Sequence, residues 1–274
     1  MRNTAKITTA VLAAGALTLG LGACGAGNDA SDTSGPLIVA ASPVPHAEIL
    51  TYVKDNLAKK EGLDLEVKEF TDYTSQNPAT QDGSVGANYF QNKPYLDDYN
   101  KKNGTDIVPV VTVHLEPLGL YSRKVEKAGD LKSGATVAVP NDTVNEARAL
   151  KLLAANGLIT LKAGIGNEAT PSDITKNPKN LKFKELEAAQ TPRSLDDVDA
   201  AVVNGNYAIE SDLEPAKDAL VLESPKNNPY GNFLAVKKGQ EDDPRVKKLA
   251  KLLTSPEVKK FIQDKYAGSV LASF

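Results

Sequence analysis

The stretch ATVAVPNDTVNEARALKLLAANG (residues 135–157) joins a strand pattern to a helix pattern without a break. Its first six residues are small, β-branched and apolar, which predicts a buried strand. The next residues include Asn141 and Asp142, either of which can cap a helix, and Gly157 stands where that helix would end. A strand followed directly by a helix is the repeating unit of α/β proteins.

The same alternation extends along most of the chain. Strand patterns are LIVAA (37–41), LDLEVKEF (63–70), LKFKEL (181–186), VDAAVV (198–203) and FLAVKKG (233–239). Helix patterns follow the first of them at 45–62 and close the chain, where Ser255 and Pro256 mark a helix start. In the apolar run 106–122, Pro109 and Pro117 are expected to prevent one continuous strand. We therefore expect an α/β fold, and a body of about 240 residues favours two lobes over one core.

The N-terminus differs from this body. Arg2 and Lys6 precede an apolar run that is too short to cross a bilayer comfortably, and the run leads into LGAC, which ends at Cys24, the chain's single cysteine. This pattern resembles a bacterial lipoprotein signal (1–23), with Cys24 as the lipidated residue; a plain secretory signal is the alternative. A small, polar tether (24–35) follows. The chain is thus expected to be anchored on the extracytoplasmic face of the cell membrane.

Charge and motifs argue against several classes of protein. Removing Arg2 and Lys6 leaves 30 basic residues against 35 acidic ones, a balance that disfavours nucleic acid as a partner. The two histidines, His46 and His114, are not at metal-ligand spacing, and no nucleophile or phosphate-binding motif is present. We therefore expect no metal, no cofactor and no catalysis.

One short stretch, GANYFQNKPYL (86–96), combines two aromatic and two amide side chains in a chain that is only 5% aromatic. Neither a simple alternating strand nor a surface turn explains this mixture. It is typical of a pocket wall that contacts a ligand with both apolar and polar parts. We expect Phe90 to form that wall and Tyr89 to pack behind it.

Seven longer segments resemble the methionine-binding lipoproteins of the MetQ/NlpA family. They are ASPVPHAEIL, EFTDY, KPYLDDYN, VHLEPLGLYS, ATVAVPND, LKFKELEAAQTPRSLDDVDAAVVNGNYA and SPEVKKFIQDKYAG, in the family's order, and the resemblance spans residues 37–274. It implies a two-lobe type II periplasmic-binding-protein fold with a ligand cleft between the lobes. Lobe 1 would comprise residues 36–117 and 233–274, and lobe 2 residues 118–232.

The resemblance also implies ligand contacts by Arg148 and Asn145. They lie three residues apart and therefore share one face of the helix that begins near Asp142. An arginine beside a helix N-terminus is suited to binding a carboxylate. Without the resemblance, the residues favour the alternative, in which Arg148 is a surface side chain that pairs with Glu146 or a neighbour.

Three further asparagines are candidate ligand contacts, Asn204, Asn206 and Asn232, and Asn232 matches a ligand contact of the family. The first two follow the strand pattern 198–203, and ligands of α/β sheets bind outside the carboxyl ends of strands. Simple turn formation is the alternative for Asn204, which precedes a glycine, and for Asn232 in NNPYGN.

Tyr73 and Phe90 match residues that flank the methionine side chain in the family, with ordinary core packing as the alternative. His114 and Glu116 match a hinge segment that faces the cleft, although backbone hydrogen bonds alone could hold such a histidine. Asn92 departs from the family, whose commoner residue at this position is histidine. An asparagine donates and accepts as a neutral imidazole does, but it is shorter.

The function implied is that of an ABC-importer lipoprotein that captures L-methionine between its lobes and delivers it to a permease powered by an ATPase, both being separate chains. One alternative keeps the fold but binds D-methionine, a methionine-containing dipeptide or another small amino acid. The other is an exported lipoprotein hydrolase.

Overall fold

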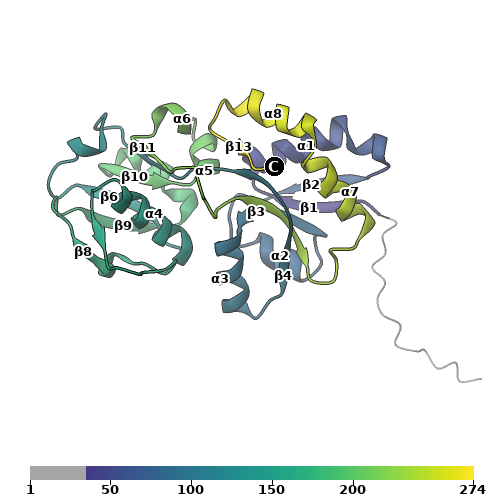
Figure 1. Ribbon diagram of the computed structural model, residues 1–274, viewed down its shortest axis with the longest axis horizontal. Coiled ribbons are helices and arrows are strands. Elements are labelled where there is room, and N and C mark those ends of the chain that lie inside the picture. The colour runs from purple at the N-terminus through teal and green to yellow at the C-terminus, as the bar shows by residue number, and fades with distance from the viewer. Residues whose placement is uncertain (1–34) are drawn as a thin grey trace, which may run out of the picture. The chain divides into compact units, whose positions relative to one another are not determined.

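The computed structural model describes residues 35–274, so the predicted signal peptide and Cys24 lie outside the described residues. The described residues belong to one compact unit. Within the described part, strands and helices alternate as the sequence predicts, which confirms the α/β class (Figure 1). None of the helices in residues 35–274 has both the length and the apolar character needed to span a bilayer.

A six-stranded mixed sheet has the order β13-β4-β12-β3-β1-β2. Strands β1, β2 and β3 run parallel to one another, whereas β12 is antiparallel to both β3 and β4. The bounds of its strands are β1 Leu37–Ala41, β2 Leu65–Glu69, β3 Ala87–Asn92, β4 Ile107–Leu115, β12 Asn232–Lys237 and β13 Leu271–Ala272. The helices that accompany it are α1 Glu48–Asn56, α2 Gln76–Gln81, α3 Lys93–Asn103, α7 Pro244–Leu253 and α8 Pro256–Tyr266, with short turns at η1 Pro43–Ala47 and η2 Ala58–Glu61.

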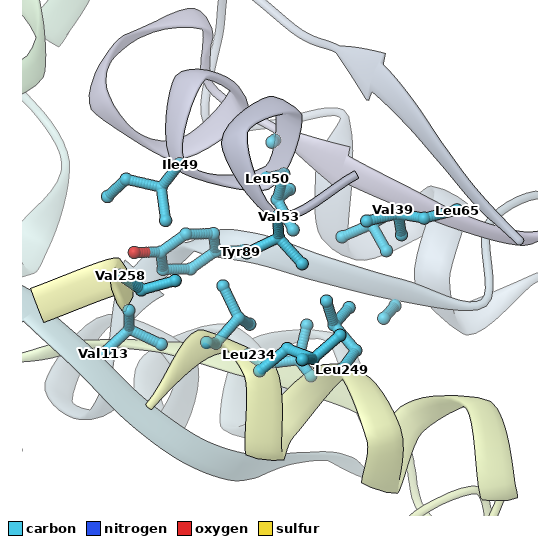
Figure 2. Close-up of a cluster of buried hydrophobic side chains, with 14 of the residues drawn as sticks. Val39, Ile49, Leu50, Val53, Leu65, Tyr89, Val113, Leu234, Leu249 and Val258 are labelled. Carbon is cyan, nitrogen blue, oxygen red and sulfur yellow. The ribbon is translucent and has the colours of Figure 1, made fainter. Parts of the chain in front are cut away.

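The first hydrophobic core lies between this sheet and the helices α1, α7 and α8. Ile49, Leu50 and Val53 recur at helical spacing on α1, and all three are fully buried. Figure 2 shows them pointing toward Tyr89 of β3, with Leu249 of α7 close to the sheet. Tyr89 is therefore a core residue, as expected, and it fixes β3 against the helices.

A second, five-stranded sheet has the order β11-β5-β10-β6-β9. Its strands are β5 Gly119–Tyr121, β6 Thr136–Pro140, β9 Lys182–Leu186, β10 Ala200–Val203 and β11 Val221–Leu222. Helix α4 (Thr143–Ala155) contributes to the core on one face, while α5 (Gly205–Glu210) and short 3-10 turns, η5 Ala188–Gln190 and η6 Pro192–Asp196, contribute to the core on the other. The remaining elements are α6 Pro215–Asp218, the paired β7 Thr160–Leu161 and β8 Ile174–Lys176, and the 3-10 turns η3 Ala128–Asp130 and η4 Pro171–Asp173.

The strand–helix unit β6–α4 forms as its sequence predicts. Oδ1 of Asp142 accepts a hydrogen bond from the N–H of Asn145 at 3.0 Å, which caps α4. Gly157 follows the end of the helix with a φ of +72°, a conformation that glycine adopts without strain. Ser255 caps α8 in the same way, because its Oγ accepts from the N–H of Val258 at 3.3 Å.

The expectation about Pro109 is wrong. Strand β4 runs unbroken from Ile107 to Leu115 and includes this proline. The short β13 pairs with β4 only at His114 and Leu115. Beside Pro109 that edge of β4 has no partner strand among the described residues, so the N–H that proline lacks is not needed for strand pairing. The strand does end before Pro117, as expected, and the chain then passes to the second sheet. The boundaries of the two lobes stay predictions.

Candidate functional site

A small pocket lies where elements of both sheets meet. Strand β3 ends in the pocket, β12 begins there, and α4 and α5 face it with their first turns. The lining residues are Tyr73, Phe90, Gln91, Asn92, Tyr95, Glu116, Asn145, Arg148, Asn204, Gly205, Asn206 and Asn232.

Nine of the ten residues singled out from the sequence thus line one pocket, and the tenth, His114, lies behind it. The sequence analysis missed Gln91, Tyr95 and Gly205. Gln91 is the neighbour of Phe90 within β3, whose six residues are all buried, and Tyr95 stands on the first turn of α3. The quoted GANYFQNKPYL stretch contains both, so its composition was the available signal.

Arg148 is buried and held from three sides. Its Nε donates to Oε1 of Glu223 at 3.0 Å, and its Nη2 donates to Oε2 of Glu223 at 2.5 Å and to the main-chain oxygen of Glu116 at 3.0 Å. The guanidinium also lies 4.1 Å from the ring centre of Tyr230. Within residues 35–274, Nη1 of Arg148 has no hydrogen-bond partner, so it remains available to an anion in the pocket.

The pairing with Glu223 replaces the partner considered from sequence, Glu146. Burial alone would raise the pKa of Glu223, but the hydrogen bonds and charge of Arg148 prevail and lower that pKa below its usual value. Glu223 therefore stays ionised and fixes the orientation of the guanidinium.

Asparagine side chains form a connected chain beside Arg148. Nδ2 of Asn145 donates to both carboxylate oxygens of Asp142, at 3.1 and 2.9 Å, and Nδ2 of Asn204 donates to Oδ1 of Asn145 at 3.0 Å. Oδ1 of Asn204 is buried and has no partner within the described residues. Because an unpaired buried acceptor is costly, this oxygen indicates a place for a ligand donor.

Aromatic rings provide the apolar part of the pocket. Tyr73 lies 5.9 Å from Phe90 and 6.0 Å from Tyr95, measured between ring centres. The hydroxyl of Tyr73 donates to Oδ1 of Asn206 at 2.5 Å and so connects the two sheets at the pocket. Both Tyr73 and Phe90 line the cavity, and Tyr73 also packs against the core around Tyr207.

Asn92 has a structural role as well as a place in the pocket lining. Its Oδ1 accepts from the N–H of Tyr95 at 3.1 Å and thereby caps α3. Only its Nδ2 is left to face a ligand. Asn92 therefore also starts the helix that presents Tyr95.

Glu116 follows β4 and is 6% exposed. Its Oε1 lies 2.8 Å from Nε2 of His114 and 3.2 Å from Nε2 of His46, and the N–H of Asn206 also donates to the carboxylate. The sequence spacing of the two histidines did not suggest that they meet. Their Nε2 atoms lie at hydrogen-bond distance from one shared carboxylate oxygen.

The protonation of this cluster follows from burial. Burial lowers the pKa of His114 to about 3. Burial also lowers the pKa of His46 to about 4, against the opposing charge of Glu116, so both rings are neutral near pH 7. Burial also raises the pKa of Glu116, while His46, Arg148 and the N–H of Asn206 oppose that rise.

The pocket can therefore contact an anion through Arg148, a cation through Glu116 and Asn204, and an apolar chain through its rings. Among the described residues that line it there is no serine, threonine, cysteine or lysine.

Comparison with known proteins agrees with this geometry. The family model of the NlpA lipoproteins matches residues 37–274. The methionine-binding lipoprotein MetQ of Bacillus subtilis is 44% identical over 92% of this chain and 93% of its own length.

Two solved structures are similar to this one. A nutrient binding protein from Burkholderia cenocepacia, bound to methionine, has a TM-score of 0.84 and 48% identity and covers 87% of this chain and 100% of its own. An ABC transporter periplasmic substrate-binding protein from Coxiella burnetii has a TM-score of 0.83 and 42% identity and covers 86% and 100%. The family match spans nearly all of the described residues, and the chain belongs to the NlpA lipoprotein family.

Proposed function

We propose that this protein is the substrate-binding lipoprotein of an ABC importer and that it captures L-methionine in the pocket. The observation that carries the proposal is the donor set of that pocket, in which a guanidinium, a carboxylate and a group of aromatic rings surround one small cavity. A free amino acid with an apolar side chain needs these three kinds of contact. The name of the Bacillus relative and the methionine bound in the Burkholderia structure support the same ligand.

In the proposed complex, the methionine carboxylate binds Nη1 of Arg148. The ammonium group donates to the carboxylate of Glu116 and to Oδ1 of Asn204, which lacks a protein donor. The thioether lies against Phe90 and Tyr73. The amides of Asn92, Asn145, Asn206 and Asn232 complete the polar wall.

The magnitudes favour a ligand that satisfies all three contacts. Burying the methionine side chain contributes roughly 2 kcal/mol. A sulfur–aromatic contact adds about 0.3–1.5 kcal/mol. A hydrogen bond to a charged group contributes about 1.5–3 kcal/mol. None of these is sufficient alone for tight capture, so an amino acid with a polar side chain and a thioether without a carboxylate are both rejected.

The proposed transport role also implies a membrane anchor and partner proteins. The lipid is attached to Cys24, and the tether holds the binding unit at the extracytoplasmic face of the membrane. A permease and an ATPase on separate chains receive the ligand. In this role the protein binds and delivers the ligand and carries out no catalysis of its own.

Native mass spectrometry of the unlipidated protein, purified without residues 1–24, tests the ligand. A co-purified mass equal to methionine supports the proposal, and chiral chromatography of the released ligand then separates L- from D-methionine. A co-purified mass equal to a methionine-containing dipeptide would instead identify that larger molecule as the ligand. Turnover of esters or peptides by an empty protein would contradict the transport role.

A further inference from the structure

A buried chain of hydrogen bonds lies directly behind the pocket and includes both histidines of the protein. The hydroxyl of Tyr89 is hydrogen-bonded to Nδ1 of His114, whose Nε2 contacts Oε1 of Glu116 at 2.8 Å. On the other side, Nε2 of His46 lies 3.2 Å from Oε1 of Glu116 and 3.2 Å from Oδ1 of Asn232. Glu116 and Asn232 line the pocket, whereas the other three residues do not.

The partners of each ring determine its tautomer. An ionised carboxylate and an amide oxygen only accept hydrogen bonds, so the Nε2 atoms of His46 and His114 must carry the protons. In a neutral ring the other nitrogen is then an acceptor, and Tyr89 donates to Nδ1 of His114. Tyr89 is fully buried in the first core, so it holds His114 in this tautomer and orientation.

Neutral histidines differ from a lysine or an arginine in the charge that they bring to Glu116. They donate hydrogen bonds to the Glu116 carboxylate without adding a positive charge beside it. The one guanidinium nearby, that of Arg148, is already paired with Glu223 and reaches only the main-chain oxygen of Glu116. A ligand ammonium group is therefore the cation that completes the charge balance of the pocket.

We propose that His46 and His114 are positioning residues: as neutral rings protonated at Nε2, they hold Glu116 ionised and turned toward the ammonium group of the ligand. This inference rests on the proposed function. His114, which the sequence analysis placed among the ligand contacts, acts through Glu116 instead.

The other groups that face Glu116 are consistent with this role. The N–H of Asn206 on α5 donates to the carboxylate, and Arg148 on α4 favours the ionised form by its charge. Glu210, an exposed residue at the end of α5, has a pKa raised to about 7, chiefly because the surrounding protein limits solvation of its carboxylate, and Glu116 is one of the charges that raise it. When the Nε2–H donors are removed, the pKa of Glu116 should rise, because hydrogen bonds to a carboxylate stabilise its charged form.

The test compares two ligands that differ in one group. L-Methionine and 4-(methylsulfanyl)butanoate share the thioether and the carboxylate, but the second lacks the ammonium group. Calorimetric titration of the ligand-stripped protein should give the wild type at least a tenfold preference for methionine. Leucine at position 46 or 114 (His46→Leu, His114→Leu) should reduce that preference below threefold. His46→Gln and His114→Gln retain an Nε2–H donor and should restore most of it.

A purely structural role would weaken both ligands equally and leave their ratio unchanged. Tyr121→Phe is the matched control, because it removes a buried hydroxyl from the second sheet, outside the pocket lining, and should leave the ratio at its wild-type value. Where a leucine variant does not fold, Tyr89→Phe keeps every ring and removes only the hydroxyl that orients His114. It should lower the ratio at least twofold.

A pH series gives an independent readout. Between pH 8 and pH 6, the leucine variants should lose methionine affinity by a factor at least three times larger than the wild type does, because Glu116 protonates at higher pH without its donors. In one outcome, the wild type shows the tenfold preference for methionine while the leucine variants keep both this ratio and the wild-type pH profile. That result would overturn the inference about the histidines but not the proposed function. A wild type that binds no methionine would overturn the proposed function itself.

Discussion

Gly205 of α5 and Glu116, at the end of β4, are packed so closely that a Cβ atom at position 205 would lie 2.7 Å from Cβ of Glu116. It would also lie 3.0 Å from Oε2 of the same side chain. Gly205 does not have a positive φ, so close approach and not backbone conformation explains the glycine here. The absence of one side chain thus lets the carboxylate lie beside the first turn of α5.

Gly205→Ala should displace Glu116 and weaken methionine binding at least tenfold, because the carboxylate can no longer reach the same position. Calorimetry measures the affinity, and thermal melting by circular dichroism checks that the protein still folds. Gly166→Ala is the control, since a Cβ at Gly166 meets nothing within 4 Å. Equal affinities for the two variants would contradict the role of this contact.

Arg148→Ala and Asn232→Ala should each weaken methionine binding at least tenfold. The first removes the carboxylate partner and leaves Glu223 buried without its cation, and the second removes a pocket amide that also accepts from His46. The exposed Arg193→Ala change serves as the control for loss of a positive charge. Unchanged affinity in both pocket variants would refute the assignment of the site.

Phe90→Leu tests the thioether contact. L-Norleucine has a methylene group where methionine has sulfur, so the wild type should prefer methionine by about 2- to 10-fold, as a sulfur–aromatic contact of 0.3–1.5 kcal/mol implies. The leucine variant should lower this preference below twofold. Phe261→Leu, which changes a ring that stacks on Tyr52 at 4.3 Å outside the pocket lining, should preserve it.

Glu146→Gln should change how stability depends on pH. Glu146 is 6% exposed, its Oε1 has no partner within the described residues, and burial, followed by the charges of Glu185 and Asp142, raises its pKa from 4.5 to about 7. Between these two values the folded chain keeps a proton that the unfolded chain releases. The wild type should therefore lose stability relative to the variant as pH rises, by at most about 1.4 kcal/mol per pH unit.

Denaturant unfolding at pH 5, 6, 7 and 8 measures this difference, which should grow up to about pH 7 and then level off. The lowered pKa values of the histidines affect both proteins and cancel in the comparison. Glu66→Gln, on the exposed edge of β2, should show no such trend. A pH-independent difference for Glu146→Gln would mean that this carboxyl is not protonated in the folded protein.

The sequence predicted those parts of the site that depend on local periodicity. Asn145 and Arg148 share a helical face because they are three residues apart, and the Asn204 segment follows a strand that is recognisable from its apolar run. Contacts between distant segments were not predictable in this way. Glu223, which holds Arg148, lies 75 residues away in the chain, and His46 meets His114 and Glu116 only after the first sheet has formed.

The error at Pro109 has a related cause. Proline disfavours a central strand because it lacks an N–H, but the cost depends on which neighbour would need that group. Only the short β13 lies on that side of β4, and it ends before Pro109. The pairing partners of a strand, and not its own residues, decided the outcome.

Crystals of the refolded, ligand-free protein grown with L-selenomethionine test the central claim most directly. Residues 35–274 contain no methionine, so every anomalous selenium signal from this part of the chain must come from the ligand. The account predicts one strong peak in the pocket, beside the rings of Phe90 and Tyr73. Empty density in that pocket, or a selenium peak elsewhere, would contradict the account.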